Sequence, residues 1–161
     1  MDDSLLDNFD QGPIKLGAAL RGLTHEQLSY VPTDEKLGKW TIAHVVIHLA
    51  DAESAFADRI KRIIAEDDPT LLAWDENRFS ERLHYPDQSA EDAAAIIALT
   101  RRQLSRVLRK LPEAAFSRSG QHSQRGRQTL TDVLKFDVWH LEHHLNFIHL
   151  KRNALGIPLG D

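Results

Sequence analysis

The sequence predicts an all-α protein whose residues 1–161 form one four-helix bundle, with a long connection between the second and third helices. Four stretches repeat apolar residues at intervals of three and four, which is typical of helices with one buried face. No stretch shows the alternation of a half-buried strand, and no internal repeat is found. Since each amphipathic helix must bury one face, a bundle is the usual arrangement for four of them. Residues 1–10 are polar and are expected to fray.

The first helix is expected over residues 13–22, because Pro13 suits a first helical turn. A capping box that begins at Thr24 predicts one further short turn. The second long helix follows its N-cap, Thr41, and meets no glycine or proline before Pro69. These signals predict the first half of the bundle.

The connection after the second helix runs to Gln88 and is expected to contain a short helix after Asp75. Connections of this length usually have a function or cover a site. A third helix is expected over residues 90–110. The fourth helix is capped at Thr129 and is expected to end near Asn153.

The fourth helix contains four of the nine histidines. At about 100° per residue, His140 and His144 lie on one edge of the apolar stripe, whereas His143 lies roughly opposite its centre. Side chains four residues apart share a helical face, so this pair can reach one metal ion. His48 lies at the edge of the buried stripe of the second helix and is the third candidate ligand. The alternative is that these histidines only pack against or flank the core.

Two carboxylates on the same two helices also need an explanation. Asp137 precedes His140 by one turn on the same edge of the apolar stripe. There it would orient a histidine or act as a general base on a metal-bound water. The alternative is that Asp137 is a solvated carboxylate without such a role. Glu53 falls inside the apolar stripe of the second helix. Burial of an unpaired carboxylate is costly, so we expect Glu53 to pair with Arg59 or with a histidine N–H.

Composition narrows the classes of function. The net charge of -4 provides no general attraction to nucleic acid or to anionic membranes. No run of about 18 apolar residues is present and the N-terminus lacks a secretory pattern, so we expect a cytoplasmic location. The absence of cysteine excludes disulfides, zinc–cysteine sites and a cysteine nucleophile.

Three segments resemble the DinB-like superfamily, in particular its YfiT-like branch: residues 40–53 (WTIAHVVIHLADAE), 74–76 (WDE) and 139–145 (WHLEHHL). The resemblance extends over residues 20–150. It implies a four-helix bundle that holds a zinc- or nickel-type divalent ion through three histidines, one on the second helix and two on the fourth. Ile47 stands where YfiT-like sequences can have another histidine, a difference that would alter the wall of the pocket.

Matching of the motifs assigns the ligands to His48, His140 and His144, the three residues selected from the helical projection. Three imidazoles leave a coordination position open, as in catalytic zinc sites, although imidazole also suits nickel, copper or iron. Such an ion activates water or a thiol. Together with the resemblance, this predicts a metal-dependent enzyme that either hydrolyses a small molecule or transfers a low-molecular-weight thiol.

Further residues are candidates for substrate contacts. Arg125 and Arg127 lie, with Arg118, in a loop without acidic residues, which is either a solvated loop or a basic rim that attracts an anionic substrate or thiol cofactor. Tyr85, with His84 and Trp74, is expected to wall the pocket from the long connection.

Two other functions stay open at this stage. One is a non-catalytic metal-binding or stress-response bundle that acts as a homodimer through exposed apolar residues such as Trp139. The other is a plain bundle whose histidines only pack.

Overall fold

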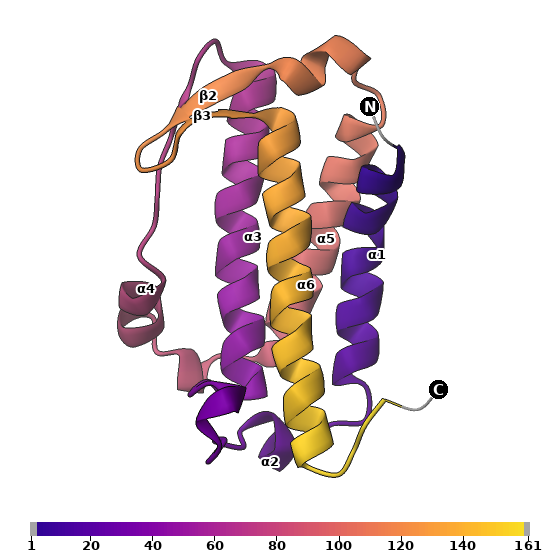
Figure 1. Ribbon diagram of the computed structural model, residues 1–161, viewed down its shortest axis with the longest axis vertical. Helices are drawn as coiled ribbons and strands as arrows, with labels where there is room; N and C mark the ends of the chain where they lie inside the picture. The colour runs from indigo at the N-terminus through magenta and orange to yellow at the C-terminus, as the bar shows by residue number, and fades with distance from the viewer. Residues whose placement is uncertain (1–2, 160–161) are drawn as a thin grey trace.

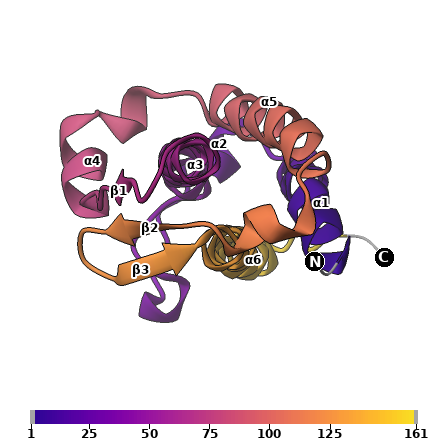
Figure 2. The same ribbon diagram turned by 90° about the horizontal axis from the view of Figure 1, so that it is seen from above.

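The computed structural model describes residues 3–159 and has the expected four-helix bundle. Its long helices run side by side along the longest axis of the molecule (Figure 1). They are α1 (Asp3–Leu20), α3 (Ile42–Ala65), α5 (Ala90–Leu108) and α6 (Leu130–Ala154). Both α1 and α3 pack against α5 and α6, so the successive helices α1 and α3 occupy opposite corners of the bundle (Figure 2).

Short elements close the two ends of the bundle and cover one side. They are α2 (His25–Leu28), η1 (Glu35–Leu37), β1 (Thr70–Leu71), α4 (Glu76–Arg82), η2 (Tyr85–Asp87), η3 (Glu113–Ser117), β2 (Ser119–His122) and β3 (Gly126–Thr129). The expected short helix after Asp75 is therefore present as α4, and Asp75 caps it by accepting hydrogen bonds from the backbone N–H groups of Asn77 and Arg78.

The expectation that residues 1–10 fray is wrong for residues 3–10, since α1 begins at Asp3; residues 1 and 2 lie outside the described part of the chain. Leu6 and Phe9 are buried, so the amphipathic stripe of α1 extends before Pro13. Burial of these side chains stabilises turns that local sequence preferences do not predict.

Pro13 consequently lies inside the helix, where its missing N–H cannot bond the carbonyl of Phe9. Arg101 of α5 supplies the replacement, because its Nη1 donates to Phe9 O at 3.2 Å. The proline that was expected to start α1 thus leaves a backbone acceptor free for a buried arginine.

The expected absence of strands is also wrong, because three short strands form a sheet in the order β1-β2-β3. Strand β1 pairs with β2 in parallel, and β2 pairs with β3 antiparallel. A Cβ on Gly120 would lie 2.6 Å from the carbonyl oxygen of Pro69, so the close approach of these segments requires glycine. The sheet depends on this long-range pairing, and its short polar strands have no alternation to detect.

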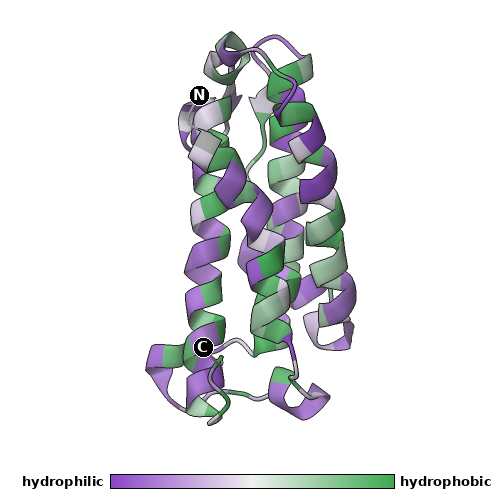
Figure 3. Cartoon of the chain, turned by 90° about the vertical axis from the view of Figure 1, so that its right-hand side faces the viewer, coloured by the Kyte–Doolittle hydropathy of each residue, from purple (hydrophilic) through white to green (hydrophobic). Residues whose placement is uncertain are grey.

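The core fills the space between the four long helices. Hydrophobic and hydrophilic residues are interspersed along each of them, as expected of amphipathic helices (Figure 3). Charged side chains are also buried there, among them Glu53 of α3, Arg101 of α5 and Asp137 of α6. Among residues 3–159, no helix has the length and apolar character needed to cross a membrane.

Candidate metal centre

Three histidines converge between α3 and α6. One ring nitrogen of each of His48, His140 and His144 lies within 4.8 Å of the others. The Nε2 atoms of His48 and His140 are 3.2 Å apart. His143 is exposed and stacks on Trp139, with ring centroids 5.0 Å apart. The structure thus brings together the three histidines selected from the sequence, and His143 is not part of this group, although its ring centroid lies 5.3 Å from that of His144.

Helix caps help to determine where these histidines lie. The side chain of Thr41 accepts a hydrogen bond from His44 N at 3.1 Å and starts α3, so that His48 follows two turns later on the inner face. Thr129 and Asp132 form a capping box that starts α6. Packing of α3 against α6 then brings the histidines of the two helices together.

Two tryptophans flank the histidines. The ring centroid of Trp40 is 4.9 Å from that of His48, and Trp74 stacks on His48 at 5.5 Å. Trp74 comes from the long connection, which therefore covers part of the site. These rings limit the access of water to the imidazoles.

The environment keeps the three imidazoles neutral near pH 7. Burial lowers the pKa of His140 to about 2, that of His48 to about 3 and that of His144 to about 4, with further lowering by neighbouring charged groups in each case. Neutral imidazole is the form that binds metal ions. The pKa values therefore favour ligation rather than proton storage.

The three side chains fit a metal ion. Zinc–nitrogen bonds of about 2.0–2.1 Å in tetrahedral geometry separate two ligand nitrogens by about 3.3 Å, close to the observed 3.2 Å between His48 and His140. Two neutral Nε2 atoms at that distance need a proton or a cation between them. In addition, Nδ1 of His144 is buried without a hydrogen-bond partner among the described residues. A three-imidazole site for a divalent ion is consistent with this arrangement.

Glu53 does not have the partner expected from the sequence. Its Oε2 accepts a hydrogen bond from Arg101 Nε at 2.9 Å, whereas Arg59 donates to the carbonyl of Leu72. The expectation of Arg59 or a histidine is wrong because Arg101 reaches Glu53 from another helix, which a projection of α3 alone cannot reveal.

Asp137 is 1% exposed, so the alternative of a solvated carboxylate is wrong. Its Oδ1 pairs with Arg101, and its Oδ2 has no partner among the described residues. Burial raises the pKa of Asp137, against the effect of Arg101. A role as a base, or as an acceptor for a histidine, remains a prediction.

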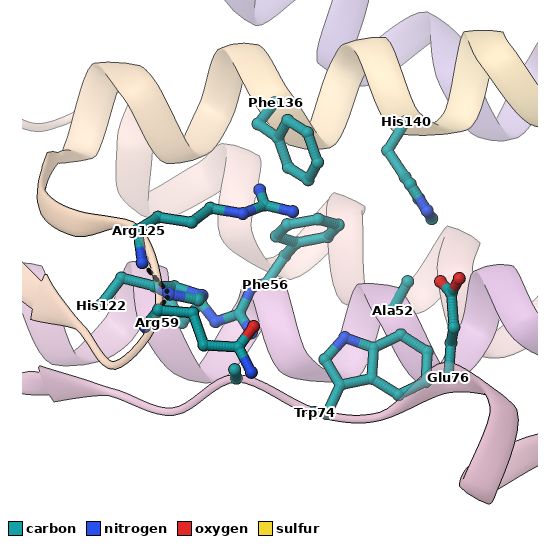
Figure 4. A pocket seen from close by; sticks show the side chains of 11 residues that line it. Ala52, Phe56, Arg59, Trp74, Glu76, His122, Arg125, Phe136 and His140 are labelled. Atoms are coloured by element: carbon teal, nitrogen blue, oxygen red, sulfur yellow. Dashed lines mark hydrogen bonds between the residues drawn. The ribbon is translucent and has the colours of Figure 1, made fainter.

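A cavity of about 120 Å³ lies beside His140 (Figure 4). Side chains from α3, from the long connection, from the β2–β3 hairpin and from α6 line it. They include Phe56, Arg59, Trp74, Glu76, His122, Arg125, Phe136 and His140. Arg59 and His122 are among the lining residues that were not predicted as site residues. Nothing in their local sequence indicated a site, since the hairpin and α3 meet only in the folded chain.

The candidate substrate contacts have different surroundings. Arg125 and Arg127 are both exposed, but Arg125 lines the cavity, whereas Arg127 pairs with Asp68. Tyr85, in η2, is buried against another part of α3, where its hydroxyl donates to Asp51. Tyr85 and Arg127 are not among the residues that line the cavity beside His140.

The chain is thus a four-helix bundle in which three histidines converge next to a cavity, and bundle cores of this kind can host metal sites. The chain belongs to the DinB superfamily, whose sequence profile matches residues 8–148. This confirms the family expected from the sequence.

Two relatives are provisionally named as metal-dependent hydrolases. YfiT of Bacillus subtilis is 31% identical over 158 residues, which cover 96% of this chain and 85% of YfiT. A protein of Oceanobacillus iheyensis is 29% identical over 143 residues, which cover 89% of this chain and 81% of the relative.

Solved structures have the same fold. The structure of Bacillus subtilis YfiT, described as a four-helix bundle of unusual topology, matches with a TM-score of 0.86 and 28% identity, over 96% of this chain and 87% of YfiT. A mycothiol-dependent maleylpyruvate isomerase matches with a TM-score of 0.69 over 91% of this chain and 60% of the isomerase. At 16% identity, that second likeness shows the fold alone.

Proposed function

We propose that this protein is a metal-dependent enzyme whose ion is held by His48, His140 and His144 and whose small-molecule substrate enters the cavity beside His140. The main support is the convergence of three neutral imidazoles, two of them with Nε2 atoms 3.2 Å apart, at the edge of a cavity. The names of the relatives agree with this reading. Zinc and nickel are the first ions to test, because imidazole suits both.

A divalent ion with three imidazole ligands would keep an open position at which water or a thiol loses its proton near neutral pH. The residues of this chain would supply the surroundings of that position. Trp40 and Trp74 would limit access of bulk water. Asp137 is a candidate proton acceptor through its unpartnered Oδ2.

Hydrolysis is the reaction we place first, and transfer of a low-molecular-weight thiol is the second candidate. Thiol transfer is supported by Arg125, which lines the cavity and would attract an acidic thiol cofactor. Turnover of small esters and amides, compared with thiol-dependent loss of an electrophile such as monobromobimane, separates the two. If added thiol leaves turnover unchanged while ester or amide cleavage persists, transfer is excluded.

The metal site is tested by measuring the metal content of untagged protein by mass spectrometry. We expect about one transition-metal ion per chain in the parent and its loss in His48→Ala, His140→Ala and His144→Ala. His143→Ala is the matched control, since it removes a histidine from the same helix and should keep the ion. A parent that binds neither zinc nor nickel, or loss of the ion only in the control, would refute the assignment.

A non-catalytic homodimer is the alternative from another class. Trp139 is 54% exposed, which leaves an aromatic surface on α6 for a second copy. The mass in solution, with and without metal, tests this alternative. A monomer at every concentration would rule it out.

A further inference from the structure

The cavity beside His140 has two ends of different chemistry (Figure 4). His140 and the carboxylate of Glu76 lie toward one end, together with Trp74. Arg59, His122 and Arg125 lie toward the other. The rings of Phe56 and Phe136 lie between the two ends.

Neither arginine has an ion pair with a carboxylate of residues 3–159. Arg59 is 6% exposed, and its Nε and Nη2 both donate to the carbonyl oxygen of Leu72, at 3.2 and 2.7 Å. Arg125 stacks its guanidinium on Phe136, with Cζ 4.1 Å from the ring centroid. The nearby Asp58 accepts a hydrogen bond from Arg62, with 2.8 Å between Arg62 Nε and Asp58 Oδ2. Two positive charges therefore share one cavity wall, and Asp58 acts on Arg59 only through its charge, without an ion pair.

The two guanidinium groups are close enough to affect each other. Burial lowers the pKa of Arg59, and the charge of Arg125 lowers it further. Like charges repel more strongly where burial reduces solvent screening. An anion between the two groups would relieve this repulsion.

His122 adds a neutral donor to the same end. Its Nδ1 accepts hydrogen bonds from the backbone N–H groups of Gln124 and Arg125, at 3.2 and 3.3 Å. The ring proton of neutral His122 must then be on Nε2. Burial, together with Arg59 and Arg125, lowers the pKa of His122 and keeps the ring in this neutral form.

We propose that Arg59, His122 and Arg125 form an anion subsite that binds the carboxylate or phosphate of the substrate, while the reacting group of the substrate lies at the His140 end. The aromatic walls Phe56 and Phe136 favour a flat, apolar spacer between the two groups. The substrate class is thus a small carboxylate or phosphate ester with an apolar body. The statement about the reacting group rests on the proposed metal function, whereas anion binding itself does not.

The test is calorimetric titration of benzoate, benzamide and inorganic phosphate into metal-loaded and chelator-treated protein. Benzamide has the shape of benzoate without its charge. We expect benzoate to bind about tenfold or more tightly than benzamide in both forms of the protein, because a hydrogen bond to a charged group contributes about 1.5–3 kcal/mol. Phosphate binding without benzoate binding would identify phosphate esters as the class, and the reverse would identify carboxylates.

Arg125→Met should weaken anion binding about tenfold to a hundredfold. Arg127→Met is the matched control from the same hairpin, because Arg127 is exposed and pairs with Asp68; it should bind anions as the parent does. Arg125→Lys keeps the positive charge but loses the planar guanidinium group, so its affinity for anions should lie between those of the parent and Arg125→Met. Because Arg59 also donates to Leu72 O, Arg59→Lys completes the set, and its thermal unfolding is measured alongside anion binding.

The subsite is refuted if neither benzoate nor phosphate binds saturably, if benzamide binds saturably and as tightly as benzoate, or if Arg125→Met and Arg127→Met have equal effects on anion binding. Metal content, measured on every sample, separates the two proposals. Absence of metal with intact, Arg125-dependent benzoate binding would overturn the metal function and leave the subsite standing. Bound metal without dependence on Arg125 would overturn only the subsite.

Discussion

Arg101 joins the helices of the bundle through a buried polar cluster, and its removal should be among the most damaging single changes. The side chain is 2% exposed. It pairs with Glu53 of α3 and Asp137 of α6, and it donates to Phe9 O of α1. Burial would lower the pKa of Arg101, but Asp137 and Glu53 outweigh it and raise that pKa. Arg101→Met would leave two carboxyl groups buried without their cation.

Breaking a buried ion pair by removing one partner costs about 3–5 kcal/mol. That is a large part of a typical free energy of unfolding of about 5–15 kcal/mol. For a chain of this size the corresponding fall in Tm is about 6–20 °C. Urea and thermal unfolding, followed by circular dichroism, measure both quantities.

The triple variant Arg101→Met, Glu53→Met, Asp137→Leu tests whether the unpaired carboxyl groups cause the loss of stability in Arg101→Met. Replacement of a whole buried charge cluster by apolar residues of similar size is often neutral or stabilising, so the triple variant should regain most of the lost stability. A loss below about 1 kcal/mol in Arg101→Met, or a triple variant less stable than Arg101→Met, would refute the reasoning.

Two further predictions concern Gly12 and the pH dependence of stability. Gly12→Ala should destabilise the protein by roughly 1–3 kcal/mol, because the new Cβ would lie 2.4 Å from Arg101 Nη1. Gly17→Ala, on the same helix, adds a Cβ that meets nothing within 4 Å, and it should stabilise the protein by about 1 kcal/mol. Equal changes of the two variants in the free energy of unfolding in urea would contradict this prediction. In metal-free protein, the pKa of His140 is lowered by burial, so the unfolded chain binds more protons below about pH 6.5 and stability is lost as the pH falls. Below about pH 6.5, the free energy of unfolding of the parent should thus fall by about 1.4 kcal/mol per pH unit relative to that of His140→Leu. If the difference in free energy between the two proteins did not change with pH, the lowered pKa of His140 would be refuted.

The sequence alone determined most of the helices and the candidate ligands, because both depend on local periodicity; the first turns of α1 are the exception. The 3.6-residue repeat places His140 and His144 on one face regardless of what packs there. Caps such as Thr41 and Thr129 mark helix starts through bonds made within three residues.

Only the tertiary structure decided how the charged residues pair. Glu53 was expected to be paired, but its partner Arg101 is 48 positions away in the chain, on another helix. Arg125 and Arg127 are indistinguishable in the sequence, yet only Arg125 lines the cavity, because Arg125 lies in the turn before β3, whereas Arg127 lies within β3 and pairs with Asp68. Pairing of distant groups depends on which elements pack together, and local sequence preferences do not contain that information.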